Sequence, residues 1–291
     1  MRAALPFLLA AFAAVHTSIA GAAERQLGGI VGTQLNPLGL QAHVGVGWKW
    51  ALSRSTNRWL DGAHVTVGAS ESLSPAYSRT EVFVELSPLS VLDLRAGTQL
   101  VGYFGTFGHL VGFPSYDADF SDQARKALAT GARARLGNVL SASATLKFAV
   151  GRLALRSTAD LERWGVAEPG PCYYEPFRGT LLRAGGDSLV AGNSVLLLDV
   201  SASRNRQRQL GLYHDLLYVR HAPQNRRQRL GPFAAWSLGE KRFGVREPML
   251  YCGVLGYVEA PNRSGVSVLL AVGFRMGGNG RPPVRSSAAS P

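Results

Sequence analysis

Histidines are the residues of this chain best suited to chemistry, because a histidine beside a serine can activate that serine as a nucleophile. Five candidates lie beyond the N-terminal segment: His43, His64, His109, His214 and His221. None stands near a serine in a sequence setting that suggests a nucleophile. Asp215 follows His214 directly, but neighbours on an extended strand face opposite sides and do not pair. The sequence therefore predicts no catalytic residue.

The other reactive or ligand-binding types give no stronger signal. Cys172 and Cys252 form no C-x-x-C pair, so we expect no metal, redox centre or other cofactor. Export would permit a disulfide between them, but the sequence does not show whether they meet. The aromatic and glycine-rich segment 103–109 lacks the G-K-[ST] of a phosphate loop. It suits an aromatic girdle better than a ligand platform. The segment 173–177 fits a contact surface or a packed loop equally well.

Alternation of apolar and polar residues is the dominant pattern. In residues 40–52 every even position is apolar, from Leu40 to Leu52, and the odd positions are polar or small. A strand sends alternate side chains to opposite faces. Thirteen residues exceed the ~9–11 that a tilted strand needs to cross a bilayer. The same alternation recurs in residues 63–70, 81–86, 92–100, 132–137, 146–150, 196–201 and 266–274.

Charged residues occupy the polar phase of these segments. A water-filled barrel interior tolerates them, with the apolar face outward in lipid. The predicted lumen-lining residues are Glu81, Glu85, Asp93, Arg95, Arg133, Arg135 and Lys147. They either line a narrow pore in which the basic residues favour anions, or they pair across the lumen and close it. We favour closure or a very small pore, because open channels belong to wider barrels of 16–18 strands.

The spacing of turn residues predicts about twelve strands, between about ten and fourteen. They lie near 27–35, 40–52, 61–73, 77–88, 90–105, 129–139, 142–163, 194–203, 207–220, 226–239, 242–258 and 262–276. Two long connections, near 106–130 and 164–193, both follow odd-numbered strands. Long loops face outward in bacterial barrels, so the chain would begin and end in the periplasm.

The N-terminal segment reads as a signal peptide over residues 1–22, with a short basic start, an apolar run from Ala3 to Val15 and an Ala20-Gly21-Ala22 cleavage site. No later apolar run reaches the ~20 residues of a membrane-spanning helix. The remaining chain is expected to form one barrel domain over 23–276, followed by a flexible tail rich in Gly, Pro and Ser over 277–291.

The chain carries a formal charge of +12, with arginine as the main cation. Nucleic-acid binding would require basic residues clustered on one face with aromatic residues between them. Here the arginines fall mostly at strand ends, in connections or in the polar phase of strands. Nucleic acid is therefore not an expected partner, and charge at the rim or in the lumen explains the composition better.

Taken together, the signal peptide, the alternation and the unequal connections resemble outer-membrane β-barrel proteins of Gram-negative bacteria. The resemblance implies an antiparallel up-and-down transmembrane barrel, placed in the outer membrane by the barrel-insertion machinery and in contact with lipids and lipopolysaccharide. Such barrels often end at an aromatic residue, whereas here Arg275 and the tail follow Phe274. Aromatic residues expected at the membrane interface are Trp48, Trp50, Tyr103, Phe104 and Phe274.

The resemblance brings no catalytic residue with it. We therefore expect a monomeric barrel without catalysis, serving as a structural protein or a narrow passive channel with a charged lumen. Two alternatives stay open: an outer-membrane lipid-modifying hydrolase, and a secreted or periplasmic soluble β-sandwich or barrel.

Overall fold

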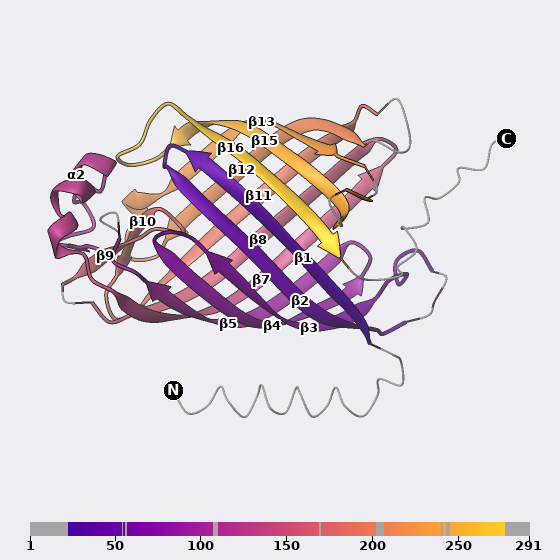
Figure 1. Cartoon of the computed structure of the whole chain (residues 1–291), viewed down its shortest axis with the longest axis horizontal. Coiled ribbons are helices and arrows are strands. Elements are labelled where there is room, and N and C mark those ends of the chain that lie inside the picture. Colours follow the sequence, from indigo (N-terminus) through magenta and orange to yellow (C-terminus); the bar gives the residue numbers. More distant parts are fainter. Residues whose placement is uncertain are drawn as a thin grey trace.

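Twelve long strands of the described residues close into one antiparallel barrel (Figure 1). The structure is a computed structural model that describes residues 23–53, 55, 57–106, 110–168, 170–201, 207–239, 241–242 and 245–276. The predicted signal peptide (1–22), the predicted tail (277–291) and His109 lie outside the described residues.

The barrel strands follow one another around the wall in chain order, each paired with its neighbours. They are β1 (Glu24–Leu35), β2 (Gly39–Ala51), β3 (His64–Leu73), β4 (Tyr77–Leu89), β5 (Leu92–Tyr103), β7 (Arg135–Val150), β8 (Leu153–Val166), β11 (Asp187–Asp199), β12 (Arg208–Val219), β13 (Arg227–Ser237), β15 (Val245–Glu259) and β16 (Val266–Met276). A two-residue strand, β14 (Lys241–Arg242), adds to the end of β15.

Pairing between the first and last strands closes the wall. β1 pairs antiparallel with β16 over nine residue pairs, from Leu27 with Met276 to Leu35 with Val268. The predicted fold class and strand number are therefore confirmed. Because the number of strands is even, the start of β1 and the end of β16 lie at the same opening of the barrel, which we call the inner end. The two long connections lie at the other, outer end, as predicted.

Several strand limits between residues 129 and 194 were predicted wrongly. The turn between the sixth and seventh strands lies at residues 151–152, where Gly151 has φ +57°, and not near 140. β7 alternates without interruption from Arg135 to Val150, so periodicity gave no sign of its true end. Residues 129–131, predicted to be strand, form the 3-10 helix η1 (Ala129–Gly131). After the second long connection, β11 starts at Asp187, earlier than the predicted 194.

Alternation places apolar side chains on the outside of the wall. Leu136, Leu161 and Leu100 are among the most exposed large apolar residues, at 69%, 59% and 57% of their surface. Their strand neighbours with the opposite phase, such as Ser141, Glu162 and Gln99, line the interior. The wall thus separates an apolar outer surface from a polar inner one. No helix among the described residues combines the length and the apolar character needed to cross a membrane.

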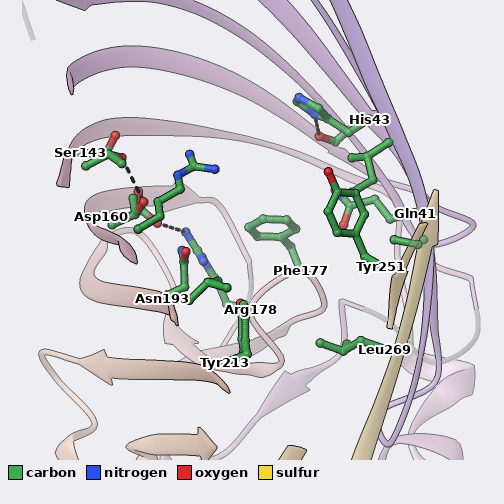
Figure 2. A pocket seen from close by; sticks show the side chains of 18 of the residues that line it. Gln41, His43, Ser143, Asp160, Phe177, Arg178, Asn193, Tyr213, Tyr251 and Leu269 are labelled. Carbon is green, nitrogen blue, oxygen red and sulfur yellow. Dashed lines mark hydrogen bonds and ion pairs between the residues drawn. The ribbon is translucent and has the colours of Figure 1, made fainter. Parts of the chain in front are cut away.

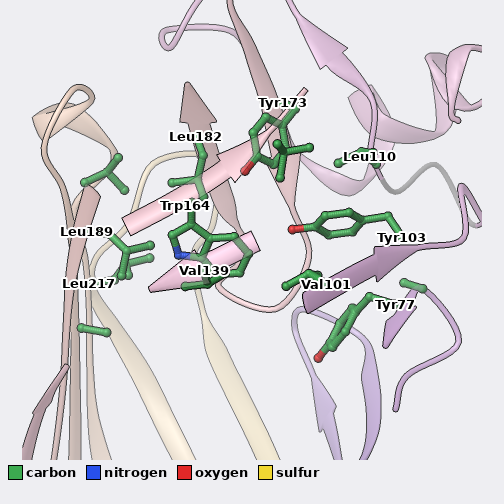
Figure 3. Packing of buried hydrophobic residues seen from close by; sticks show 14 of the residues in the cluster. Tyr77, Val101, Tyr103, Leu110, Val139, Trp164, Tyr173, Leu182, Leu189 and Leu217 are labelled. Atoms are coloured by element: carbon green, nitrogen blue, oxygen red, sulfur yellow. The ribbon is translucent and has the colours of Figure 1, made fainter. Parts of the chain in front are cut away.

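The described parts of the two long connections fold into the outer mouth. The sequence left a packed loop open only for residues 173–177. The first connection carries β6 (Gly112–Phe113), α2 (Asp122–Ala127) and η1, and the second carries the hairpin β9 (Cys172–Glu175) and β10 (Thr180–Arg183). Strands β10, β9 and β6 form a small sheet. We call these five elements the cap. Figure 3 shows its Tyr173 and Leu182 packed with Trp164, Val139 and Leu189 of the wall.

The two cysteines form no disulfide with each other. Both are free thiols, Cys172 in β9 and Cys252 in β15. The Cys172 thiol is buried and donates a hydrogen bond to the Phe113 carbonyl at 3.3 Å. Burial raises the pKa of this thiol to about 11, which makes it unreactive at neutral pH.

A first prediction tests the two faces of the wall. Ala142 and Ser143 are neighbours near the middle of β7, with Ala142 exposed outside and Ser143 lining the interior. Ala142→Arg should prevent assembly, since an arginine facing lipid at the membrane midplane costs about 2–4 kcal/mol. Ser143→Arg should assemble, because it faces the wet interior. The heat-dependent gel shift of the outer-membrane fraction measures assembly, and equal behaviour of the two variants would contradict the assigned faces.

A second prediction tests the orientation of the barrel and the packing of the cap. Trypsin added to intact cells should cut near the exposed Lys126 and Arg133 but spare Arg178, which is held inside the mouth. Arg152, exposed at an inner turn, should be cut only after the outer membrane is opened. Heat-denatured protein supplies the control, in which Arg178 is cleaved. Early cleavage at Arg152 would invert the orientation.

Candidate functional site: the barrel lumen

A cavity of about 1560 Å³ occupies the lumen, and residues from all twelve barrel strands line it (Figure 2). Its lining includes Arg58, Trp59 and Ser90 from inner connections. At the outer end it includes Leu38 and Ser74, which belong to the short turns after β1 and β3. The cavity therefore runs along the lumen from one end of the barrel to the other, beside the cap.

One side of the cavity, formed by β4, β5, β7 and β8, is charged. Arg95 pairs with Glu81, and Lys147 pairs with Asp93 at 2.7 Å. Each pair joins neighbouring strands, β5 with β4 and β7 with β5, so these charges lie along the wall. The expectation that they pair across the lumen and close it is therefore wrong for these two pairs.

The tip of the β9–β10 hairpin enters the lumen instead. The Arg178 guanidinium donates two hydrogen bonds to Glu162 of β8, one of them from Nε to Oε2 at 3.1 Å. Asp160 lies 3.7 Å from the same guanidinium, and these carboxylates raise the pKa of Arg178. From β13, Arg227 donates from Nη1 to the Arg178 carbonyl at 2.6 Å. The hairpin, tied to both β8 and β13, is what narrows the lumen.

Arg79 completes this contact from β4. Its guanidinium lies 3.7 Å from the centre of the Phe177 ring and 5.2 Å from that of Trp164. It also lies 3.7 Å from Glu162 and donates from Nε to Gln99 at 3.0 Å. A guanidinium held between two rings and a carboxylate is fixed in place, so Arg79 clamps the hairpin tip to the wall.

Glu175 is the most unusual group of the cap, because its carboxyl is fully buried. It accepts hydrogen bonds from the backbone N–H groups of Phe177, at 3.0 Å, and Arg178, and Tyr103 donates to it at 3.4 Å. Burial outweighs these donors and raises the pKa of Glu175 to about 7. Tyr103 was predicted at the membrane interface, and this is wrong: its ring is 2% exposed and packs inside the mouth.

The opposite side of the cavity, formed by β12, β13, β15, β16 and β1, is mostly apolar. Three aromatic rings follow one another on neighbouring strands: Tyr213, Phe233 and Tyr251. Ile30, Leu269 and Ala271 continue this surface. Figure 2 shows Tyr251 and Leu269 on one side of the lumen and Asp160 and Ser143 on the other. The lumen therefore has one charged wall and one apolar wall.

The structure brings five of the seven predicted lumen residues together. Glu81, Glu85, Asp93, Arg95 and Lys147 line the cavity. The other two lie at the mouth. Arg133 is exposed before β7 and donates to the carbonyls of Thr130 and Ala132. Arg135 is the first residue of β7 and pairs with Glu168 at 2.9 Å. We predicted a strand from residue 129, but β7 starts at Arg135, so Arg133 precedes the strand and Arg135 lies at its outer end.

The remaining interface aromatics lie on or near the outer surface. Trp48 and Phe104 are exposed, and Trp50 is partly exposed. Phe274 packs over Gly29 on the adjacent strand, where a Cβ at Gly29 would stand 2.8 Å from its ring. The two tryptophans lie near the inner end of β2. Their positions are those of an inner interface belt, which remains a prediction.

Three histidines contact serine or aspartate side chains that the sequence did not identify as their partners. His43 Nδ1 lies 2.8 Å from Ser72 Oγ, and both line the cavity. His64 Nε2 lies 3.2 Å from Ser87 Oγ, and His221 Nδ1 lies 2.8 Å from Asp187. Each partner is more than twenty residues away in sequence and becomes a neighbour only through strand pairing or loop folding, so local motifs gave no signal.

Seven cavity-lining arginines were also missed: Arg58, Arg79, Arg125, Arg156, Arg178, Arg227 and Arg229. Arg79 shares the phase of Glu81 and Glu85, so the alternation of that strand could have included it. The same reasoning applies to Arg227 and Arg229 on β13. Arg178 lies in a connection, where periodicity carries no information.

No protein-family model matches the sequence, and no curated protein matches it. Solved structures with distant similarity include the β domain of the Bordetella autotransporter BrkA, at 12% identity over 88% of this chain and 99% of that one, with a TM-score of 0.40. The NanC porin gives 10% identity over 86% and 100%, with a TM-score of 0.40. LpxR from Salmonella typhimurium gives 8% identity over 86% and 99%, with a TM-score of 0.42.

TM-scores this low carry no information about function, so the function must be inferred from the residues of this chain. Its architecture is decided by its own geometry: a closed antiparallel wall, an apolar outer surface and a polar, charged interior. Only closure satisfies every backbone hydrogen-bonding group of a sheet inside a bilayer. The chain therefore has the architecture of a membrane-spanning β-barrel, as predicted for a protein of the bacterial outer membrane.

Proposed function

We propose that this barrel is a narrow passive channel that favours small anions. The observation that carries the proposal is the cavity itself, whose lining joins residues from the connections at both ends of the barrel. A cavity confined to one end would suit a structural barrel better. The hairpin tip occupies part of the cross-section, so only small solutes are expected to pass.

The anion preference follows from the charge of the lining. Among the described residues, nine basic and five acidic side chains line the cavity. Lys147 and Arg95 each have an acidic partner, but Arg227 and Arg229 share the single carboxylate of Asp215. Arg156 has no acidic partner within the described part of the chain. Rings of basic side chains favour anions in a pore.

A third prediction concerns this charge. Arg156→Glu should lower the anion-to-cation permeability ratio, because it reverses the charge of a cavity-lining residue of β8. Arg163→Glu on the same strand is the matched control, since Arg163 is exposed and has the outward phase. Reversal potentials in planar bilayers under a salt gradient measure the ratio.

Two results would contradict the proposal. One is a wild-type barrel that inserts but does not conduct, which would leave only a structural role. The other is an equal change of selectivity in both variants, which would place the effective charge at the membrane surface.

A second candidate function rests on polar residues that face lipid. Ser194 of β11 and His214 of β12 are direct cross-strand partners. Their chain neighbours Val195 and Tyr213 line the cavity, so Ser194 and His214 point outward. His214 Nε2 lies 2.9 Å from Gln228 Nε2, and Ser194 Oγ lies 2.8 Å from Ser157 Oγ. An ionisable side chain within the membrane marks a functional site by default.

These residue types fit ester hydrolysis at the lipid surface. Direct partners have Cβ atoms ~4.5–5.5 Å apart, which puts a serine hydroxyl within reach of a histidine ring. In this arrangement Ser194 would be the nucleophile, His214 the general base and Gln228 the group that orients the ring. The observation favours a lipid-modifying hydrolase as the second candidate.

A fourth prediction separates this candidate from the channel. If the barrel hydrolyses lipid esters, Ser194→Ala and His214→Ala should each abolish fatty-acid release from phospholipid vesicles and leave conductance unchanged. Ser72→Ala tests the serine–histidine pair that lines the lumen cavity, His43 with Ser72. Wild-type release no greater than that of Ser194→Ala would eliminate the hydrolase, and selective loss in Ser72→Ala would move the chemistry inside.

A further inference from the structure

The aromatic residues of the apolar wall form a continuous row. The ring centres of Tyr213 and Phe233 are 5.7 Å apart with an interplanar angle of 33°. Those of Phe233 and Tyr251 are 6.2 Å apart with an angle of 24°. The three residues belong to the adjacent strands β12, β13 and β15, and all line the cavity. We call them the aromatic row.

Glycines on the next strand let two of these rings lie against the wall. A Cβ at Gly253 of β15 would stand 3.1 Å from Cδ2 of Phe233, which lies on β13. A Cβ at Gly273 of β16 would stand 3.1 Å from Cε2 of Tyr251, which lies on β15. Each ring therefore leans onto the glycine of the following strand. Rings that lie along the wall present a broad apolar surface to the cavity.

Surplus positive charge lies beside the row. Asp215 is two residues beyond Tyr213 on the same face of β12, and it accepts hydrogen bonds from Arg229 at 2.9 and 2.6 Å. Arg227 Nη2 donates to Oδ2 of the same carboxylate over a longer distance, 3.4 Å. Its Nε is buried and has no hydrogen-bond partner among the described residues. One carboxylate thus serves two guanidinium groups, and one donor of Arg227 remains unused.

From this juxtaposition, and resting on the proposed passage, we infer that the lumen holds a binding subsite for an amphipathic anion. Its ligand has a flat apolar ring system and one anionic group, such as a carboxylate. The ring packs on the aromatic row, where aromatic pairs gain energy beyond burial of area. The anionic group faces Arg227 and Arg229. A guanidinium is suited to this because its planar fork matches a carboxylate.

The site selects against two other classes of solute. A small inorganic anion gains nothing from the aromatic row. A neutral aromatic compound leaves the surplus positive charge beside Tyr213 uncompensated. Only a compound with both features uses both the aromatic row and the arginines beside it on β13, so the chemical class is narrower than the general anion preference of the channel.

The test uses the full-length barrel in detergent micelles and in planar bilayers, with 2-naphthoate as the probe. Calorimetric titration measures binding, and the reduction of single-channel current by the probe measures occupancy of the lumen. Phe233→Leu removes a ring of the row but keeps an apolar side chain, and Arg227→Gln removes one charge. Phe104→Leu is the control, because Phe104 is exposed outside the lumen. The heat-dependent gel shift confirms that each variant is folded.

We expect saturable binding of 2-naphthoate to the wild type and to Phe104→Leu. Phe233→Leu should weaken it by about two- to tenfold, the range of one aromatic pair. Arg227→Gln should weaken binding of 2-naphthoate but not of neutral 2-naphthylmethanol. These results together would support the subsite.

The outcomes for the subsite and for the channel are distinguishable. Conductance without saturable binding, or equal binding by the wild type and Phe233→Leu, would overturn the subsite and leave the channel standing. Binding without any conductance would support the subsite and overturn the channel. Equal weakening of 2-naphthoate and 2-naphthylmethanol by Arg227→Gln would remove the anionic group from the description of the ligand.

Discussion

Hydrogen bonding between β1 and β16 is the constraint on which the rest of the molecule depends. These strands are the two ends of the barrel chain, and their pairing leaves no free sheet edge in the wall. In a bilayer an unpaired edge would leave backbone groups without partners, each at a cost of several kcal/mol. Closure also fixes the register of every strand. Because a shift of one residue would exchange the two faces, the division into lipid side and lumen follows from it.

The cap uses the space that closure creates. A barrel of this size has a lumen that loops and side chains can fill. At the outer mouth, beside the cavity, the cap and the wall form a small apolar core in which Trp164 and Tyr173 are fully buried. At the tip of the hairpin, Arg178 meets Glu162 and Asp160 of β8. A partly buried guanidinium is tolerated there because two carboxylates lie beside it. The cavity of the lumen runs past this contact.

Strand periodicity was enough to predict the wall but not what fills it. The alternation around Arg95 and Lys147 placed these side chains in the lumen, because phase on a strand survives folding unchanged. The positions of Arg178 and Glu175 could not be predicted, because they lie in a connection, where strand alternation does not apply. Tyr103 was misplaced for a related reason: its strand phase was inward, but its aromatic type suggested an interface. Pairs such as His43 with Ser72 needed the register between strands, which no local pattern supplies.

β12 shows how one strand serves two environments. Tyr213 and Asp215 face the lumen, where the ring joins the aromatic row and the carboxylate holds Arg229. His214, between them, faces lipid and contacts Gln228. The Cβ atoms of successive residues point to opposite sides of the sheet, so the wall itself separates the two candidate sites. A substitution at His214 therefore acts on the lipid surface, and one at Tyr213 on the lumen. The two functions are for this reason physically independent, although the residues that carry them are adjacent in sequence.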